Sequence, residues 1–278
     1  MSTPPAAPSG PPAFPYRLIA TDLDGTLLRS DDTVSERTRA ALDAATAQGA
    51  AHIVVTGRAV PWTKQILADL GHRGLAVCAQ GSQVYDAGSG RLLTSVTLDR
   101  RVAEQALTLL EKEVGTVAVA ASRDGLDGEV LAGPGYRVHD GPLPYVPFED
   151  RETIWQQPLN KLYIQHPQLG DDELVKAARA AVGGDLVGVV MAGEGIVELL
   201  PLGLSKAKGL ALAARRLKVR AAETLAFGDM PNDIPMFAWA GRGVAMENGH
   251  EELLAVADEV TTSNDQDGIA RVLERLAA

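Results

Sequence analysis

The sequence predicts an α/β fold, with a doubly wound parallel-sheet core and an inserted α+β domain. Apolar runs typical of buried strands alternate with amphipathic helical segments from Leu18 to Ala79, and the same order returns after Leu200. Between these regions, hairpin patterns mix with helices. Because strand, helix, strand connections at this spacing form right-handed crossovers, the core strands are expected to be parallel and the middle region to be a separate module.

The first half of the core is predicted from apolar runs and the residues that stop them. The pattern Thr33-Val34-Ser35-Glu36 has the form of a capping box and begins a helix that stops at Gly49. Pro61 opens the next helix, which Gly71 closes. The strands of this half are expected at 18–20, 51–55 and 75–79.

The inserted domain is expected at residues 85–200. The core is then formed by residues 16–84 and 201–278, and residues 1–15, rich in Pro, Ala, Ser and Gly, are expected to be a disordered tail. This tail has neither the basic nor the apolar region of a signal peptide.

Within the inserted domain, Asp99 is predicted to cap a helix that ends at Val114. The Gly- and Pro-rich stretch 133–147 is typical of a long loop. The other elements are expected as a hairpin of 84–86 and 91–93, strands at 117–120, 161–164 and 186–191, and a helix at 171–182.

The second half of the core begins with a helix that Ser205 caps and that runs to Leu217. Pro231 suits the first turn of a later helix. The remaining elements are expected as strands at 225–227 and 243–246, a helix from about His250, and a last helix at 267–276.

Charge and composition exclude several classes of function. With a net charge of -10, the chain lacks the basic excess of a general nucleic-acid or anionic-membrane binder. No apolar stretch is long enough to cross a bilayer. The single cysteine, Cys78, cannot form an intramolecular disulfide and lies in an apolar run, so we expect a buried, inert thiol and a reducing, cytoplasmic setting.

The stretch Asp22-Leu23-Asp24-Gly25-Thr26 follows the first strand and dominates the chemistry of the sequence. In an extended chain, residues two apart point the same way, so both carboxylates would face one pocket. If the chain instead curls at Gly25, which tolerates positive φ, Asp24 is lifted above Asp22. Either geometry lets one carboxylate act as nucleophile or metal ligand while the other transfers protons.

Two further core strands end in polar residues. Thr56 follows the second strand, and Asp229 and Asp233 follow the strand at 225–227. Open α/β folds bind ligands at the carboxyl ends of their strands, so these groups are expected to meet Asp22 there. Carboxylates gathered without histidine or cysteine suit Mg²⁺ rather than Zn²⁺, and a cation would relieve their mutual repulsion.

Lys206 is a further candidate for the site, although a lysine at this position can equally be an ordinary surface residue. A lysine in the first turn of a helix opposes the helix dipole, a cost that stability alone would not select. Lys208 is its competitor, but it points elsewhere around the helix.

The chain resembles the haloacid dehalogenase-like (HAD) phosphatases, in particular the Cof-type members with a large α+β cap inserted after the third strand of a Rossmann-like core. The resemblance covers residues 16–278. It rests on four motifs in order, which are Asp22-Leu23-Asp24-Gly25-Thr26, Thr56-Gly57-Arg58, Lys206, and Gly228-Asp229 with Asn232-Asp233.

The resemblance implies Mg²⁺-dependent hydrolysis of a small phosphorylated metabolite through an aspartyl phosphate. Asp22 is the implied nucleophile, and Asp24 the implied acid that protonates the leaving alcohol and then activates water. The implied metal ligands are Asp22, the carbonyl of Asp24, Asp229 and Asp233. The implied phosphate-binding residues are Thr56, Gly57, Arg58 and Lys206, with Asn232 orienting Lys206 or the acids.

Several alternatives stay open. The dehalogenases lack an acid at the position of Asp24, so phosphoryl transfer is favoured, but phosphomutases retain it. A catalytically idle metabolite-binding regulator is the non-enzymatic alternative. The expected substrates are sugar phosphates or phosphorylated cofactors such as flavin mononucleotide or pyridoxal phosphate, and the expected state is a monomer or homodimer.

The sequence departs from the family pattern at Gln80, where an Asn-Gly pair usually closes the third strand, and at Ala207, where glycine is frequent. The histidines show no ligand spacing and are expected to be structural. Polar residues of the insert that could meet a leaving group are predicted to be solvated, and these are Arg123, Asp124, Arg137, His139 and Lys161.

Overall fold

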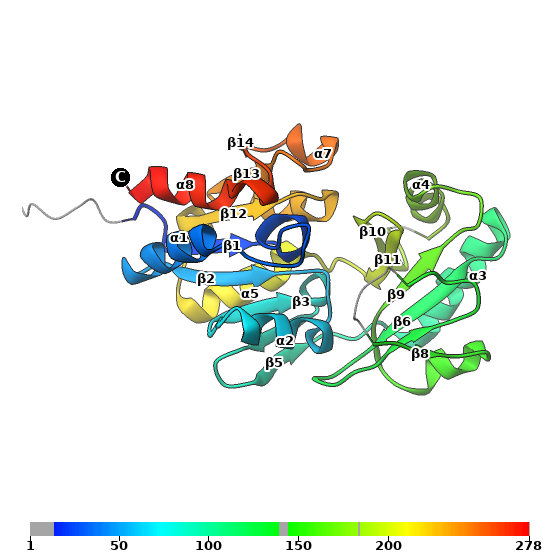
Figure 1. Cartoon of the computed structure of the whole chain (residues 1–278). Helices are drawn as coiled ribbons and strands as arrows, with labels where there is room; N and C mark the ends of the chain where they lie inside the picture. Colours follow the sequence, from blue (N-terminus) through cyan, green and yellow to red (C-terminus); the bar gives the residue numbers. More distant parts are fainter. Residues whose placement is uncertain (1–13, 139–143, 183, 278) are drawn as a thin grey trace, which may run out of the picture.

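The computed structural model describes residues 14–138, 144–182 and 184–277. These residues form two bodies, a core and a cap, joined by two crossings of the chain (Figure 1). The expected tail lies almost wholly outside the described residues. Phe14, which was assigned to it, is instead buried, and its amide donates to Gln48 Oε1 at 3.1 Å.

The core is built on one eight-stranded sheet in the order β14-β13-β12-β1-β2-β3-β4-β5. β1 lies in the middle and pairs in parallel with β12 on one side and β2 on the other. The core strands are β1 Leu18–Thr21, β2 Ala51–Val55, β3 Leu75–Cys78, β4 Gln83–Asp86, β5 Arg91–Ser95, β12 Thr224–Gly228, β13 Arg242–Met246 and β14 Glu259–Thr261.

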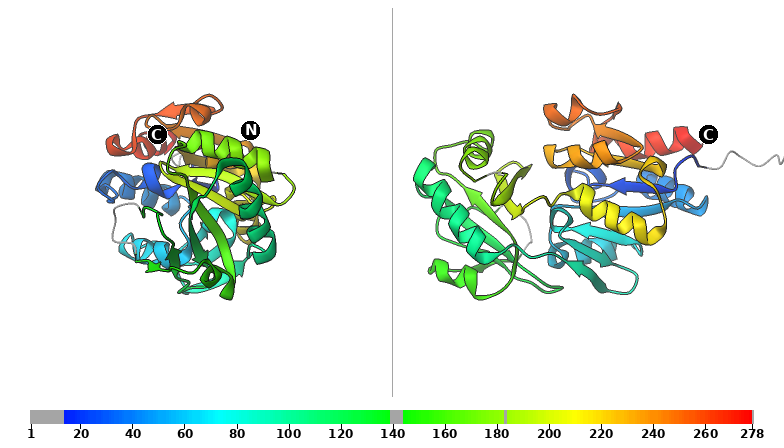
Figure 2. Two further views of the ribbon diagram at one scale, coloured as in Figure 1. Left: turned by 90° about the vertical axis from the view of Figure 1, so that its right-hand side faces the viewer. Right: turned by 180° about the vertical axis from the view of Figure 1, so that it is seen from behind.

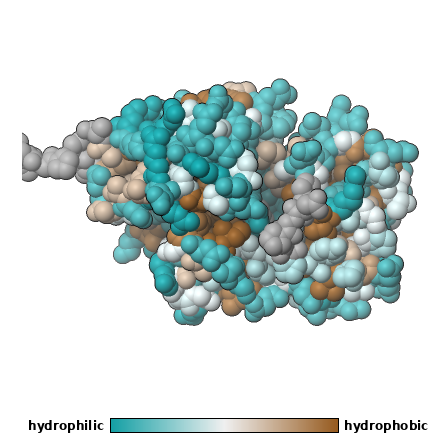
Figure 3. Space-filling view, viewed as in Figure 1, coloured by the Kyte–Doolittle hydropathy of each residue, from teal (hydrophilic) through white to brown (hydrophobic). Residues whose placement is uncertain are grey.

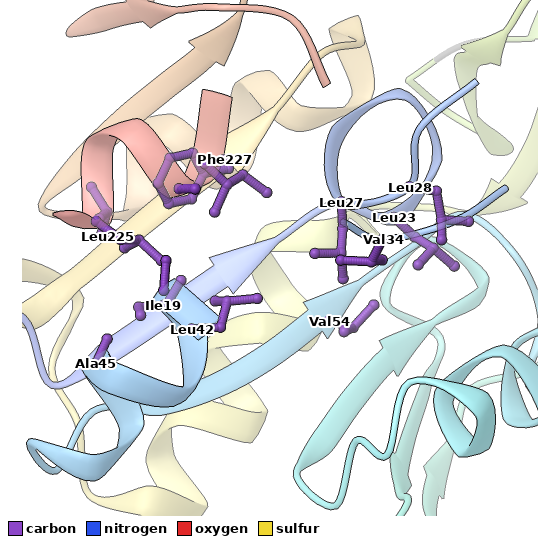
Figure 4. Close-up of a cluster of buried hydrophobic side chains, with 14 of the residues drawn as sticks. Ile19, Leu23, Leu27, Leu28, Val34, Leu42, Ala45, Val54, Leu225 and Phe227 are labelled. Atoms are coloured by element: carbon purple, nitrogen blue, oxygen red, sulfur yellow. The ribbon is translucent and has the colours of Figure 1, made fainter. Parts of the chain in front are cut away.

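Helices cover both faces of this sheet, as the doubly wound prediction requires. One face packs against α1, α2 and α8 in a cluster that includes Ile19, Leu42 and Phe227 (Figure 4). The other face packs against α5, α6 and α7. The core helices are α1 Glu36–Ala47, α2 Val60–Asp69, α5 Lys206–Leu217, α6 Ile234–Trp239, α7 Glu251–Leu254 and α8 Gly268–Ala277.

The cap is a six-stranded sheet in the order β10-β11-β9-β6-β7-β8 with helices on one side. The helices α3 Arg100–Val114 and α4 Asp171–Val182 lie on the side away from the core (Figure 2). The opposite side of the sheet therefore faces the core. The cap strands are β6 Ala118–Arg123, β7 Val130–Ala132, β8 Val146–Pro147, β9 Leu159–Gln165, β10 Val187–Gly193 and β11 Ile196–Pro201.

The hairpin after β3 belongs to the core rather than to the cap. β4 pairs antiparallel with β3, and β5 with β4, so both extend the core sheet. The boundary expected at residue 85 is therefore wrong, and the chain leaves the core sheet after Ser95. The hairpin itself is confirmed, but a local pattern does not reveal which sheet a strand joins.

Other elements differ from the sequence-based expectation. The capping box at Thr33 is wrong by two positions, because Ser35 is the N-cap of α1 and its hydroxyl accepts from the Thr38 amide. Within the expected loop at 133–147 the described part contains β8, and residues 139–143 lie outside the described structure. The strands β7, β11 and β14 were not predicted, because each is short or follows only a brief turn.

Candidate active site

The turn after β1 presents two carboxylates at different heights. The chain stays extended at Asp22 and then curls through Leu23–Leu27, with Gly25 at φ 72°. The second of the two predicted geometries is therefore the one observed. A β carbon at Gly25 would collide with the Asp229 carboxylate, so both the positive φ and the close approach require glycine.

Three buried carboxylates meet at the carboxyl end of the sheet. One oxygen each of Asp22, Asp229 and Asp233 lies within 4.8 Å of the others. Thr26 Oγ1 donates to Asp229 Oδ1 at 2.7 Å, and the amides of Asp229 and Met230 donate to Asp233 Oδ2 at 3.2 and 3.1 Å. These bonds fix the acids in place while leaving oxygens free to converge.

Lys206 lies beneath these acids and is almost fully buried. Its Nζ donates to Oδ1 of Asp22 and to Oδ1 of Asp233, each at 2.7 Å. Ser205 caps α5 as predicted, so Lys206 is the first residue of that helix, whereas Lys208 is exposed. Lys206, and not Lys208, is therefore the lysine that lies at the acids.

The electrostatics of the cluster show that one lysine does not balance the acids. Burial raises the pKa of Asp22 well above its ordinary value, although Lys206 opposes this. Burial and then Asp233 raise the pKa of Asp229 to about 6. For Lys206, burial lowers the pKa, but the two carboxylates outweigh it and the net shift is upward.

The donor set suits a hard divalent cation. The three clustered side chains offer only carboxylate oxygens, which Mg²⁺ and Ca²⁺ prefer. Burial and the neighbouring carboxylates raise the pKa values of Asp22 and Asp229, and a cation bound between these acids would lower both pKa values. Asp24 is not part of the side-chain cluster, and its side chain is 47% exposed.

The loop after β2 connects the second motif to the acid of the first. Arg58 forms a forked pair with Asp24, with Nε 2.9 Å from Oδ2 and a terminal nitrogen 2.5 Å from Oδ1. Thr56 is buried, and its hydroxyl accepts from the Arg58 amide at 3.0 Å. The Thr56-Gly57-Arg58 loop thus lies beside Asp24.

Asn232 was expected to orient Lys206 or the acids, but among the described residues its side chain forms no hydrogen bond with them. Its Nδ2 donates to Gln80 Oε1 at 3.1 Å, so the residue that departs from the family pattern is its partner. Gln80 has a left-handed backbone at φ 58°. This pairing joins two chain segments far apart in sequence, which explains why local patterns did not reveal it.

Asn248 lies beside the turn that follows β1. Its Nδ2 donates to the carbonyl oxygen of Gly25 at 2.8 Å, and its Oδ1 accepts from the Asn264 amide at 3.0 Å. It therefore supports the turn that carries Asp24.

The histidines of the described residues play structural roles, as expected. His52 Nε2 lies 2.9 Å from Thr21 Oγ1 and its ring packs edge-on against His72. His166 and His250 accept backbone N–H groups just after them in the chain. His139 lies outside the described residues.

Two residues of the insert that were predicted to be solvated are buried. Lys161 is 1% exposed and Arg123 is 9% exposed. Lys161 pairs with Glu198 of β11, a residue that the sequence analysis missed along with its strand. The signal that was available is the apolar stretch Ile196–Leu200 after Gly195, with one glutamate inside it.

Comparison with a family model gives a match to "haloacid dehalogenase-like hydrolase" over residues 19–273. Within the described residues, no helix is both long enough and apolar enough to span a membrane.

Curated relatives match nearly the whole chain. The chain is 32% identical over 277 residues to "Endoribonuclease YBEY, chloroplastic" of Arabidopsis thaliana. The aligned region covers 96% of this chain and 47% of that protein. The chain thus spans about half the length of this relative. It is 27% identical over 289 residues to the 5-amino-6-(5-phospho-D-ribitylamino)uracil phosphatase YwtE of Bacillus subtilis, covering 94% of this chain and 98% of that one.

The fold matches that of solved structures. A haloacid dehalogenase-like hydrolase from Bacillus subtilis superposes with a TM-score of 0.79 at 25% identity, covering 94% of this chain and 99% of the other. Both the core and the cap are included in a match of this coverage.

Proposed function

The chain belongs to the haloacid dehalogenase-like hydrolases and is a phosphatase of small phosphorylated metabolites, and from this premise we propose a Mg²⁺-dependent mechanism that proceeds through an aspartyl phosphate on Asp22. The observation that carries the proposal is the cluster of Asp22, Asp229 and Asp233 around Lys206 at the end of β1. A cluster of this kind provides the nucleophile and the countercharge in one place.

Asp22 is the proposed nucleophile because it ends the central strand and is held by Lys206. Its free carboxylate oxygen attacks phosphorus, so that an O–P bond forms and the bond to the leaving alcohol breaks. Asp24 gives its proton to the leaving oxygen and later takes one from water. Its side chain is 47% exposed, so substrate can reach its carboxylate once it displaces the Arg58 fork.

The residues that hold the phosphoryl group are proposed from the same loop and helix. Lys206, Thr56 and Gly57 are the proposed holders of the phosphoryl oxygens. Arg58, which pairs with Asp24 here, would exchange that carboxylate for a substrate oxygen. Asn232 acts through Gln80. These residues would position the phosphoryl group and neutralise its charge, and these two effects provide most of the catalysis of phosphoryl transfer.

The proposed metal ligands are Asp22, the carbonyl of Asp24, Asp229 and Asp233, the last directly or through water. Bound Mg²⁺ would neutralise charge on the transferring group and screen it from the nucleophile. The raised pKa values of Asp22 and Asp229 support this set, because a cation there would return both carboxyls to the ionised form.

The proposed substrates are sugar phosphates or phosphorylated cofactors such as flavin mononucleotide or pyridoxal phosphate. The relative YwtE is named for a substrate that carries a phosphorylated ribityl chain, which favours the polyol members of this class. The buried free thiol of Cys78 is consistent with a cytoplasmic setting. We propose a monomer or homodimer.

The test is release of inorganic phosphate from a panel of sugar phosphates, flavin mononucleotide and pyridoxal phosphate, with Mg²⁺ and with EDTA. Wild type should release phosphate only with Mg²⁺, and Asp22→Asn should release none. Asp31→Asn, an exposed carboxylate near the same turn, is the matched control and should behave as wild type. Transfer of phosphate to a second hydroxyl would indicate a phosphomutase, and binding without turnover a regulatory protein.

A further inference from the structure

The side of the cap sheet that lacks helices touches the catalytic end of the core. Side chains alternate along β9, and Leu162 and Ile164 pack against the cap helices. Lys161 therefore points toward the core, where its Nζ donates to the carbonyl oxygen of Gly57 at 2.6 Å. Figure 3 shows the indentation between core and cap on one face of the molecule.

Lys161 and Glu198 form an ion pair on this side of the cap. Their side chains are 1% and 2% exposed, and Lys161 Nζ also lies 4.5 Å from the centre of the Tyr163 ring. Burying two charges is costly, and an apolar pair of similar volume often stabilises a protein as well or better. Stability alone does not account for a charged pair at this place.

Polar atoms around the pair lack partners. Within the described residues, Glu198 Oε2 is buried and accepts no hydrogen bond, and Ser122 Oγ is also buried and unpaired. Ser122 lies directly opposite Lys161 in the pairing of β6 with β9. Because most buried polar groups in proteins are paired, two such atoms on either side of one lysine indicate a missing partner.

The core presents unpaired atoms to the same region. In the part of the chain that the structure describes, Gln80 Nε2 and Asn232 Oδ1 are buried without partners, although the two side chains bond to each other through their other atoms. A β carbon built on Gly57 would lie 2.6 Å from Gln80 Nε2 and 3.9 Å from the β carbon of Ala192 in the cap. Gly57 is thus the point where the Gln80 donor and the Lys161–Glu198 pair meet.

We propose that Glu198 and Gln80 select the leaving group of the substrate, and that this leaving group is uncharged and carries hydroxyls. The inference rests on the proposed phosphatase function. A hydroxyl both donates and accepts, so it can donate to Glu198 Oε2 and accept from Gln80 Nε2. A carboxylate or second phosphate only accepts and would meet the Glu198 charge, while Lys161 is already engaged by Gly57 and Glu198.

The test compares two substrates of equal chain length, erythritol 4-phosphate and 4-phosphoerythronate, with p-nitrophenyl phosphate, which has no hydroxyl. Wild type should prefer the polyol phosphate to the carboxylate by about tenfold or more in kcat/KM. Glu198→Gln should lower kcat/KM for the polyol phosphate by about 10- to 100-fold and leave p-nitrophenyl phosphate within about twofold. Glu194→Gln, an exposed glutamate at the neighbouring turn, is the matched control and should change neither.

A second variant guards against simple misfolding. Lys161→Met combined with Glu198→Leu removes both charges at similar volume, so it should unfold at or near the wild-type temperature and lose the polyol preference. If either variant loses all three substrates equally, or the folded double variant keeps the preference, the inference is overturned. If wild type does not hydrolyse even p-nitrophenyl phosphate, the proposed function fails first and the inference falls with it.

Discussion

Replacing Lys206 with methionine tests whether the buried lysine holds the acids together. Its Nζ lies 2.7 Å from carboxylate oxygens of both Asp22 and Asp233, and its side chain is 1% exposed. Methionine keeps most of the volume and removes the charge. Removing one partner of a buried ion pair costs about 3–5 kcal/mol, because the remaining charge is left uncompensated. We therefore expect the free energy of unfolding of Lys206→Met, in EDTA near neutral pH, to fall by that amount.

The matched control is Lys208→Met, which alters an exposed lysine on the same helix. Its free energy of unfolding should stay within about 0.5 kcal/mol of wild type. Urea unfolding followed by circular dichroism measures both. Mg²⁺ should restore part of the stability of Lys206→Met, since the cation supplies the missing positive charge. Equal stability of the two variants would refute this reading of the site.

Three other perturbations follow from the same geometry. Asp24→Asn should slow phosphate release about 10²- to 10⁴-fold, because the leaving group loses its acid. Mg²⁺ should still raise the unfolding temperature of this variant, because the Asp24 side chain lies outside the acidic cluster, and loss of that rise would contradict the proposed metal ligands. The pKa of Asp229 is raised from 3.8 to about 6, so between these pH values the metal-free folded protein binds a proton that the unfolded chain does not, and its stability falls as the pH rises through this window. Mg²⁺ should therefore raise the unfolding temperature more at neutral pH than at mildly acidic pH. Burial and then His72 lower the pKa of His52 from 6.5 to about 3, so stability is lost as the pH falls below 6.5, by up to about 1.4 kcal/mol per pH unit; His52→Gln should flatten that slope in urea unfolding, and an unchanged slope would count against it.

The sequence predicted best those features that depend on neighbours in the chain. Asp22 follows a strand of apolar residues, so local periodicity was enough to place it at the carboxyl edge of a parallel sheet. The serine cap placed Lys206 at the start of a helix, but its position beside the acids was expected only from the family resemblance. The curl at Gly25 was one of two open geometries. What decided it is the carboxylate of Asp229, which comes close only in the folded protein.

The features that the sequence did not reveal depend on contacts between distant segments. β4 was assigned to the cap because its pattern is that of any hairpin, and only pairing with β3 places it in the core. Lys161 was expected at the surface because lysine usually is, but a glutamate on a different strand makes its burial possible. In both cases the partner, not the residue itself, determines the outcome.

The central claim is that Asp22 becomes phosphorylated during the reaction. The most direct measurement uses Asp24→Asn with Mg²⁺ and p-nitrophenyl phosphate, whose good leaving group needs little acid catalysis, followed by rapid acid quenching and peptide mass spectrometry. The account predicts phosphate on the peptide that contains Asp22, and none when EDTA replaces Mg²⁺. Hydrolysis with no covalent phosphate, or with phosphate on a different residue, would contradict it.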